Sequence, residues 1–125
     1  MITSKLLVGN TLTAPELVFT ASTTGAPVAG SVLPQMSAIT TIILCNIKTP
    51  NISDETEEAT LVNIHLVKSG QSYQDSNRIV SRLLIPAGET VFFNDERIIL
   101  DGGDSIWVGA DNLDAVAVTV SSLPV

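Results

Sequence analysis

Hydrophobic and polar residues alternate along several short segments of this chain. In residues 115–121, Val116, Val118 and Val120 occupy every second position, with small or polar residues between them. Residues 61–67 repeat the same period. A period of two places alternate side chains on opposite faces of a β-strand, so both segments are predicted to be strands with one buried face.

Further segments rich in β-branched and apolar residues are predicted to be strands. Residues 86–89 (Pro-Ala-Gly-Glu) and 101–104 (Asp-Gly-Gly-Asp) supply the fixed and the positive φ angles of tight turns between them. Only residues 72–77 are expected to have helical character, and one turn at most. The further strands are predicted at residues 16–21, 37–46, 78–85, 90–93, 97–100 and 105–110.

Seven or eight short strands at this spacing predict an all-β fold, a single antiparallel β-sandwich of jelly-roll or immunoglobulin-like type. A chain of 125 residues is long enough for one domain, so residues 1–125 are assigned to one sandwich. Residues 22–37 are rich in small residues, Gly and Pro, and are expected to form a long loop or arm. Part of residues 1–37 is therefore expected to lie outside the sandwich.

The net charge of −7 limits the classes of partner that this protein is expected to bind. Nucleic acid and anionic membrane surfaces attract clustered Lys and Arg, so neither is expected as a partner. The N-terminal segment lacks the features of a signal peptide, and no apolar run reaches the length of a membrane helix. Synthesis in the cytosol is expected, which agrees with a single cysteine, Cys45, that cannot form an intramolecular disulfide.

Residues with catalytic chemistry are few. His65 falls in the outward register of its strand and is expected to be a surface or groove residue, because no nucleophile accompanies it. Cys45 ends an apolar run and is interpreted as a small buried residue. The sequence therefore predicts no catalytic residue, no cofactor and no enzymatic activity.

Two groups of carboxylates are candidate cation sites. Asp101 and Asp104 precede one predicted strand, and Asp111 and Asp114 follow it. Six residues of strand separate the pairs by about 20 Å, so the four cannot share an ion and are interpreted as turn residues. Residues 53–58 are expected to form a solvated hairpin tip, with a cation site or a contact with a basic neighbour as the alternative. No metal is predicted.

Four residues are candidate interface residues. Trp107 lies in the register opposite to Ile106 and Val108, so either both faces of its sheet are covered or another subunit covers it. Residues 6–8, near the N-terminus, are predicted to form an edge strand or an arm that pairs with a neighbour. The candidates are Leu6, Leu7, Val8 and Trp107.

Five short segments follow one another in a characteristic order. They are residues 42–46 (Ile-Ile-Leu-Cys-Asn), 62–70 (Val-Asn-Ile-His-Leu-Val-Lys-Ser-Gly), 84–90 (Leu-Ile-Pro-Ala-Gly-Glu-Thr), 99–106 (Ile-Leu-Asp-Gly-Gly-Asp-Ser-Ile) and the valine-rich 115–121. In this order they resemble small virion structural proteins of tailed bacteriophages, in particular those of phages that infect cyanobacteria and other marine bacteria. The resemblance covers about residues 38–122 and leaves out the N-terminal 37 residues and the acidic insertion at 49–59.

The resemblance implies a non-enzymatic β-sandwich that sits on a phage particle in many copies. Within that role a decoration or cement protein of the head is expected, with the major capsid protein as a partner and a homo-oligomer, favouring a trimer, as its assembly. A neck, tail or baseplate accessory protein is the alternative. A carbohydrate-binding or receptor-binding module is an alternative of another class, which a single Trp and a single Tyr disfavour.

Overall fold

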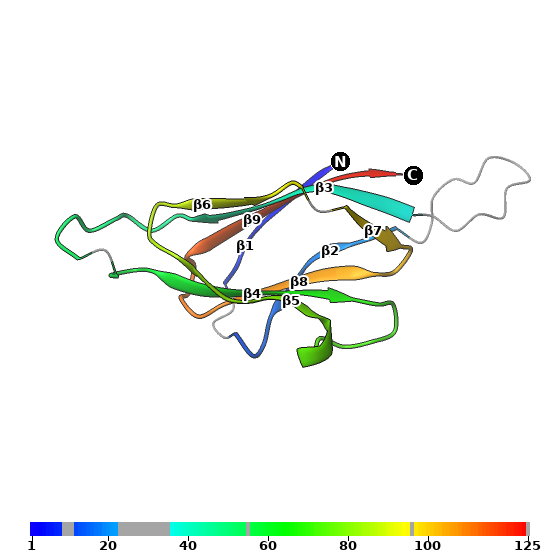
Figure 1. Cartoon of the computed structure of the whole chain (residues 1–125), viewed down its shortest axis with the longest axis horizontal. Coiled ribbons are helices and arrows are strands. Elements are labelled where there is room, and N and C mark those ends of the chain that lie inside the picture. The colour runs from blue at the N-terminus through cyan, green and yellow to red at the C-terminus, as the bar shows by residue number, and fades with distance from the viewer. Residues whose placement is uncertain (9–11, 23–35, 55, 96, 125) are drawn as a thin grey trace, which may run out of the picture.

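Two antiparallel sheets form the protein, shown by a computed structural model that describes residues 1–8, 12–22, 36–54, 56–95 and 97–124. Sheet A has the order β1 (Ile2–Leu6), β9 (Val116–Pro124), β3 (Met36–Asn46) and β6 (Thr90–Phe93), with β7 (Ile98–Asp101) also pairing with β3. Sheet B has the order β2 (Glu16–Thr20), β8 (Ser105–Ala110), β4 (Thr60–Val67) and β5 (Arg78–Ile85). Figure 1 shows the two sheets as stacked layers.

The strand order is that of a jelly roll. β6 and β7 pair with successive halves of β3, so together they occupy one strand position at the edge of sheet A. With those two counted as one, the chain passes between the sheets in the sequence of two interlocked Greek keys. The predicted all-β sandwich is confirmed, and the topology selects the jelly roll of the two predicted types.

Nine strands are present among the described residues, and the one without a firm prediction is β1. It pairs with β9 of its own chain from Ile2 to Leu6. Of residues 1–37, which were expected to be partly an arm or long loop, residues 2–6 belong to the sandwich, and the strand predicted at residues 16–21 is confirmed as β2. Residues 23–35, where most of the predicted loop falls, lie outside the described residues.

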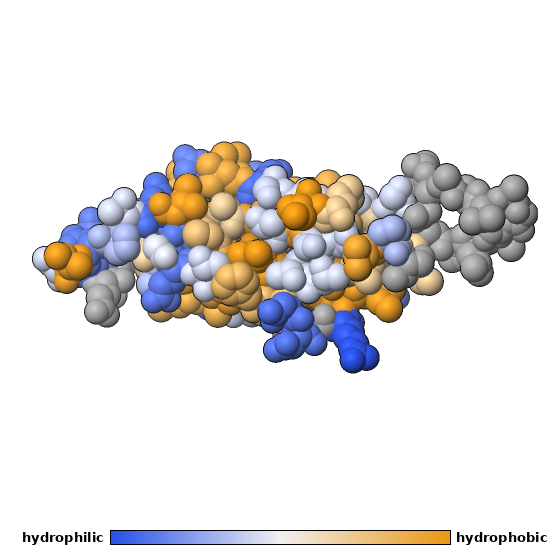
Figure 2. Space-filling model, turned by 90° about the horizontal axis from the view of Figure 1, so that it is seen from above, coloured by the Kyte–Doolittle hydropathy of each residue, from blue (hydrophilic) through white to orange (hydrophobic). Residues whose placement is uncertain are grey.

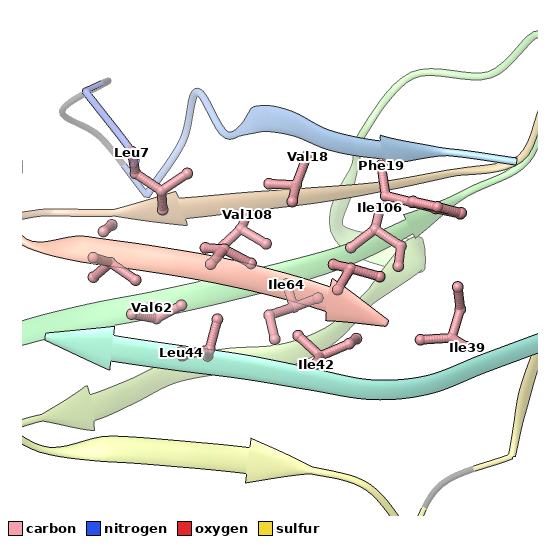
Figure 3. Close-up of a cluster of buried hydrophobic side chains, with 14 of the residues drawn as sticks. Leu7, Val18, Phe19, Ile39, Ile42, Leu44, Val62, Ile64, Ile106 and Val108 are labelled. Atoms are coloured by element: carbon pink, nitrogen blue, oxygen red, sulfur yellow. The ribbon is translucent and has the colours of Figure 1, made fainter. Parts of the chain in front are cut away.

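An aliphatic core fills the space between the sheets (Figure 3). Val116, Val118 and Val120 of β9 are fully buried, as the alternation predicted. Ile42 and Leu44 of β3 meet them from the same sheet, and the core is completed by side chains of sheet B such as Val62, Ile64, Ile106 and Val108. Removal of this apolar surface from water is the main stabilising contribution.

The ends of the sandwich carry its loops. The segment that joins β3 to β4 extends beyond one end, and it contains the acidic residues 53–58 (Figure 1). The 3₁₀ turn η1 (Asp75–Asn77) lies outside sheet B and confirms the single predicted helical turn. No helix in the described part of the chain is long and apolar enough to cross a membrane.

Candidate functional site

The outer face of sheet A is a continuous surface across four strand positions. Ser4, Thr119, Ile43 and Phe92 lie side by side across β1, β9, β3 and β6, because the strand registers pair each with the next. The same registers place the other outward-facing residues of these strands in neighbouring rows. This surface, called face A below, consists of Ile2, Ser4, Leu6, Ala38, Thr41, Ile43, Cys45, Thr90, Phe92, Ile99, Ala117, Thr119, Ser121 and Leu123.

None of these residues is charged, although the chain carries a net charge of −7. Charges lie at its margins, where Asp101 pairs with Met36 and the amino group of Met1 donates to the Ser122 carbonyl. Asp95 and Arg97 also lie at a margin, in a pocket that Ala38 and Ile99 help to line. Figure 2, which looks down on this side, shows hydrophobic and weakly polar residues over the middle and strongly hydrophilic ones mainly toward the rim and ends. Face A is therefore a surface that another protein can cover without desolvating a charge.

Several apolar side chains of face A are well exposed. Ile2 is 71% exposed, Ile99 62%, Phe92 58%, Leu123 56% and Leu6 40%. Between them lie hydroxyl groups, and those of Ser4 and Thr119 bond to each other at 3.2 Å. Face A therefore presents exposed apolar side chains interleaved with hydroxyl groups.

Cys45 belongs to this face as well. It pairs with Ala117 and Thr90 in the register and is partly exposed. Its interpretation as a buried residue is corrected, because the apolar run that it ends, residues 42–45, alternates between the two faces of β3. Leu44 is fully buried, while Cys45 points outward.

Sequence reasoning did not identify face A, yet the sequence contains a signal for it. No Asp, Glu, Lys, Arg or His occurs from Leu17 to Ile47, or from Ala115 to the C-terminus. These two segments contribute β3 and β9, which are adjacent in sheet A. The strands that would have to be recognised as neighbours are far apart in sequence, so only the fold brings the uncharged segments together.

The outer face of sheet B has a different character. Leu17, Trp107, His65 and Arg78 form a row across β2, β8, β4 and β5. The segment between β4 and β5 turns back over this row and places the Tyr73 ring against Trp107, with the ring centroids 5.5 Å apart. Trp107 donates from Nε1 to the Ser105 hydroxyl at 2.8 Å.

His65 is buried beneath this segment, with 2% of its surface exposed, which corrects its assignment as a surface residue. Its outward register is confirmed, and it helps to line a pocket on this side of the sheet. Its Nδ1 lies 3.1 Å from the Gln74 carbonyl oxygen and 2.8 Å from the Asn77 side-chain oxygen. Because a carbonyl oxygen only accepts, Nδ1 donates, and in the neutral ring Nε2 is the acceptor. The histidine therefore fastens η1 to sheet B.

A shallow pocket of about 200 Å³ opens beside the tyrosine. Arg78 contributes one wall and forms an ion pair with Asp75 at 2.9 Å. The Arg78 Nε atom is buried and has no hydrogen-bond partner among the described residues. This pocket, called the Tyr73 pocket below, is lined by Leu12, Thr13, His65, Tyr73, Gln74, Asp75 and Arg78.

Two of the four carboxylates singled out in the sequence hold backbone groups. Asp104 accepts from the backbone N–H groups of Ser69 and Asp101 at 2.9 and 3.1 Å. Asp111 accepts from the Leu61 N–H at 2.8 Å and from the Thr60 hydroxyl at 3.0 Å. Their interpretation as turn residues is confirmed, and the described residues contain no group of three or more His, Cys, Asp or Glu able to hold a metal ion.

In the acidic loop, Asp54 accepts hydrogen bonds from both the hydroxyl and the backbone N–H of Thr56, at 2.7 and 3.0 Å. These bonds favour its charged form and lower the pKa of Asp54 below its ordinary value. Asn112 donates to Glu58 at 3.0 Å. The loop is thus ordered by its own side chains in the positions that the structure describes, and Ile52 at its tip is 99% exposed.

The four predicted interface residues lie in different places. Leu7 is 1% exposed and belongs to the core, so its assignment to an interface is corrected. Leu6 is exposed on face A, and Val8 is 59% exposed just after β1. Trp107 lies on the opposite sheet and is partly covered by Tyr73 of its own chain.

No protein-family model, curated protein or solved structure matches this chain.

Proposed function

We propose that this chain is a non-enzymatic structural protein of a tailed-phage virion, which covers the head surface in many copies as a decoration or cement protein. The uncharged face A carries this proposal. An acidic protein that keeps the middle of one sheet face free of charge, with exposed Ile, Leu and Phe on it, has a surface suited to burial in an assembly.

The jelly roll supports the proposal at the level of the fold. Two stacked sheets with paired strands form a rigid block, and jelly rolls recur in viral capsid domains as well as in lectins and cupins. Fold alone does not assign a function, so this argument adds to the contact surface and does not replace it. The proposed partners are the major capsid protein and further copies of the chain.

His65 is engaged in structural contacts, since it donates to Gln74 and Asn77. Cys45 pairs in the register with Thr90 and Ala117, neither of which carries a cationic group. A nucleophilic cysteine depends on such a group to lower its pKa. A scaffold role agrees with these contacts better than a hydrolytic one.

Immunogold electron microscopy of purified particles of the encoding phage, with an antibody raised against the recombinant protein, tests the proposal. Gold over the heads is the expected result, and antibody preadsorbed with the protein is the control. Gold at the neck, tail or baseplate would move the protein to the alternative location. Absence of the protein from both the labelled particles and their peptide mass spectra would overturn the virion role.

A second candidate function is glycan binding at the Tyr73 pocket. One observation favours it, namely that the Tyr73 ring and the Arg78–Asp75 ion pair line one pocket. Sugars bind proteins by stacking on aromatic rings and by hydrogen bonds to charged groups, so these are the required elements. A glycan array probed with the wild type and with Tyr73→Ala tests it, and binding lost in the variant is the supporting result. Equal binding by both proteins, or none, would contradict it.

A further inference from the structure

We propose that face A is covered by face A or an adjoining edge of a second copy of this chain, so that the protein assembles with itself before it meets a partner. The inference names the occupant of the contact surface on which the proposed function rests. Three properties of the protein support it, namely its charge, the hydrogen-bonding groups of face A and the area of that face.

The negative charge of the chain favours the uncharged face A as the contact between copies. Two copies that each carry a net charge of −7 repel each other wherever their carboxylates approach. The acidic loop beyond one end of the sandwich and the turns at its ends carry most of the described carboxylates. Face A is a broad surface on which identical acidic chains can meet without placing like charges opposite each other.

The polar groups of face A are complementary to those of an identical face. Apart from the Cys45 thiol they are the hydroxyls of Ser4, Thr41, Thr90, Thr119 and Ser121, and a hydroxyl both donates and accepts. A surface of hydroxyls can therefore form hydrogen bonds with an identical surface, whereas a surface made only of carboxylates or only of ammonium groups cannot. A capsid protein of unrelated sequence does not need this self-complementarity, but a second copy does.

The area of face A is sufficient for an interface between two copies. Four strand positions spaced about 4.8 Å apart, and strands that average about eight residues with a rise of about 3.3 Å each, give a face of about 500 Å² per copy. Burial of both faces removes about 1,000 Å², which is the lower bound for a specific interface and is typical of weak, reversible association. The exposed Ile2, Phe92 and Ile99 supply apolar anchors for it.

The chain contains a natural reporter for this contact. Cys45 is its only cysteine and lies on face A, partly exposed. If a second copy covers the face, the rate at which Cys45 reacts with N-ethylmaleimide falls as the protein concentration rises. Light scattering after size-exclusion chromatography, over about 1 to 500 µM, measures the mass of the assembly in the same samples.

Thr119→Asp is the variant that tests the interface, because Thr119 lies in the middle of face A between Ser4 and Ile43. Thr20→Asp is the matched control, since it makes the same change at an exposed position of β2 in sheet B. Far-UV circular dichroism and the urea midpoint identify loss of folding in either variant. Phe92→Ser, which removes an exposed ring and adds no charge, provides a second test.

The expected result is a dimer or trimer for the wild type and for Thr20→Asp. For Thr119→Asp the dissociation constant of the oligomer should be at least about tenfold higher. In that variant the rate of Cys45 labelling should no longer depend on protein concentration. A wild type that stays monomeric throughout the series overturns the inference, as does an oligomer that Thr119→Asp and Phe92→Ser leave unchanged. If the monomeric wild type is still found on phage heads, the proposed function stands and another virion protein covers face A. If the oligomer forms but the protein is absent from particles, the inference stands and the proposed function fails.

Discussion

Asn46 at the end of β3 donates its side-chain amide to the Ile85 carbonyl at 3.0 Å and so joins sheet A to the last residue of β5 in sheet B. The same amide donates to the Glu58 carbonyl at 2.9 Å, and the side-chain oxygen accepts from the Lys48 N–H at 3.0 Å. Asn46 is fully buried, and its side chain uses both donor hydrogens and its acceptor. One asparagine therefore connects both sheets and the acidic loop.

Asn46→Ala should lower the free energy of unfolding by about 2–4 kcal/mol, because it leaves buried carbonyl groups without a donor. Urea unfolding followed by circular dichroism measures the loss. Asn112→Ala is the matched control, since the Asn112 amide donates to Glu58 at an exposed position and its loss should change stability by less than about 0.5 kcal/mol. Equal losses in the two variants would contradict the bridging role.

Gly88 and Gly70 form a natural pair for separating backbone strain from packing. Both have a positive φ, 79° for Gly88 and 82° for Gly70. A Cβ added at Gly88 would lie 2.7 Å from Cγ of Pro50, whereas one added at Gly70 would meet nothing within 4 Å. Gly70→Ala should therefore destabilise by about 1 kcal/mol from backbone strain alone, and Gly88→Ala by about 2–4 kcal/mol.

Differential scanning calorimetry of the two glycine variants measures this difference. Pro50→Ala removes the ring that the new methyl group meets, so it should recover part of the loss when combined with Gly88→Ala. A double variant no more stable than Gly88→Ala would show that the contact with Pro50 contributes nothing.

Asp54 should titrate below its ordinary pKa, because the two bonds from Thr56 stabilise its carboxylate. A lowered pKa in the folded state means that the stabilising contribution is present above the ordinary pKa and is lost as the pH falls through the folded value. Thr56→Val removes the hydroxyl donor and should raise the pKa of Asp54 toward its ordinary value. NMR titration of the carboxyl carbon measures both values, and an unchanged pKa in the variant would contradict the assignment.

Tyr73→Ala should expose Trp107, the single tryptophan of the chain. The expected result is a red shift of the tryptophan emission and stronger quenching by iodide, with about 1–2 kcal/mol lost from the partly buried aromatic contact. Leu84→Ala, at another partly exposed position of sheet B, is the control and should leave the emission unchanged. Identical spectra for wild type and Tyr73→Ala would mean that another group covers the indole.

Two pairs of the five short segments singled out in the sequence meet in the structure. Asn46 of the first segment accepts from the Gly88 N–H at its carbonyl, at 2.9 Å, and Gly88 belongs to the Pro-Ala-Gly turn. Asp104 of the Asp-Gly-Gly-Asp turn accepts from the N–H of Ser69, the last residue but one of the second segment. Residues that stand out in the sequence as turn chemistry thus hold the ends of strands together across the sandwich.

Local patterns predicted the strands well and the candidate sites poorly. The valine alternation of β9 and the turns around Gly88 and Gly103 depend on near neighbours, so their structure could be predicted from the sequence. The position of His65 could not, because its burial depends on a segment that folds back over sheet B. The inward place of Leu7 likewise depends on its pairing with β9, more than a hundred residues away.

The sequence by itself determined the fold class, the aliphatic core and most strand positions, because the period of two and the turn residues act over a few positions. Only the tertiary structure decided which strands became neighbours. That choice selected the jelly roll, placed Tyr73 against Trp107, and put the uncharged strands β3 and β9 side by side to form face A. The physical reason is that strand pairing joins segments distant in sequence, and the composition of a surface depends on which segments are joined.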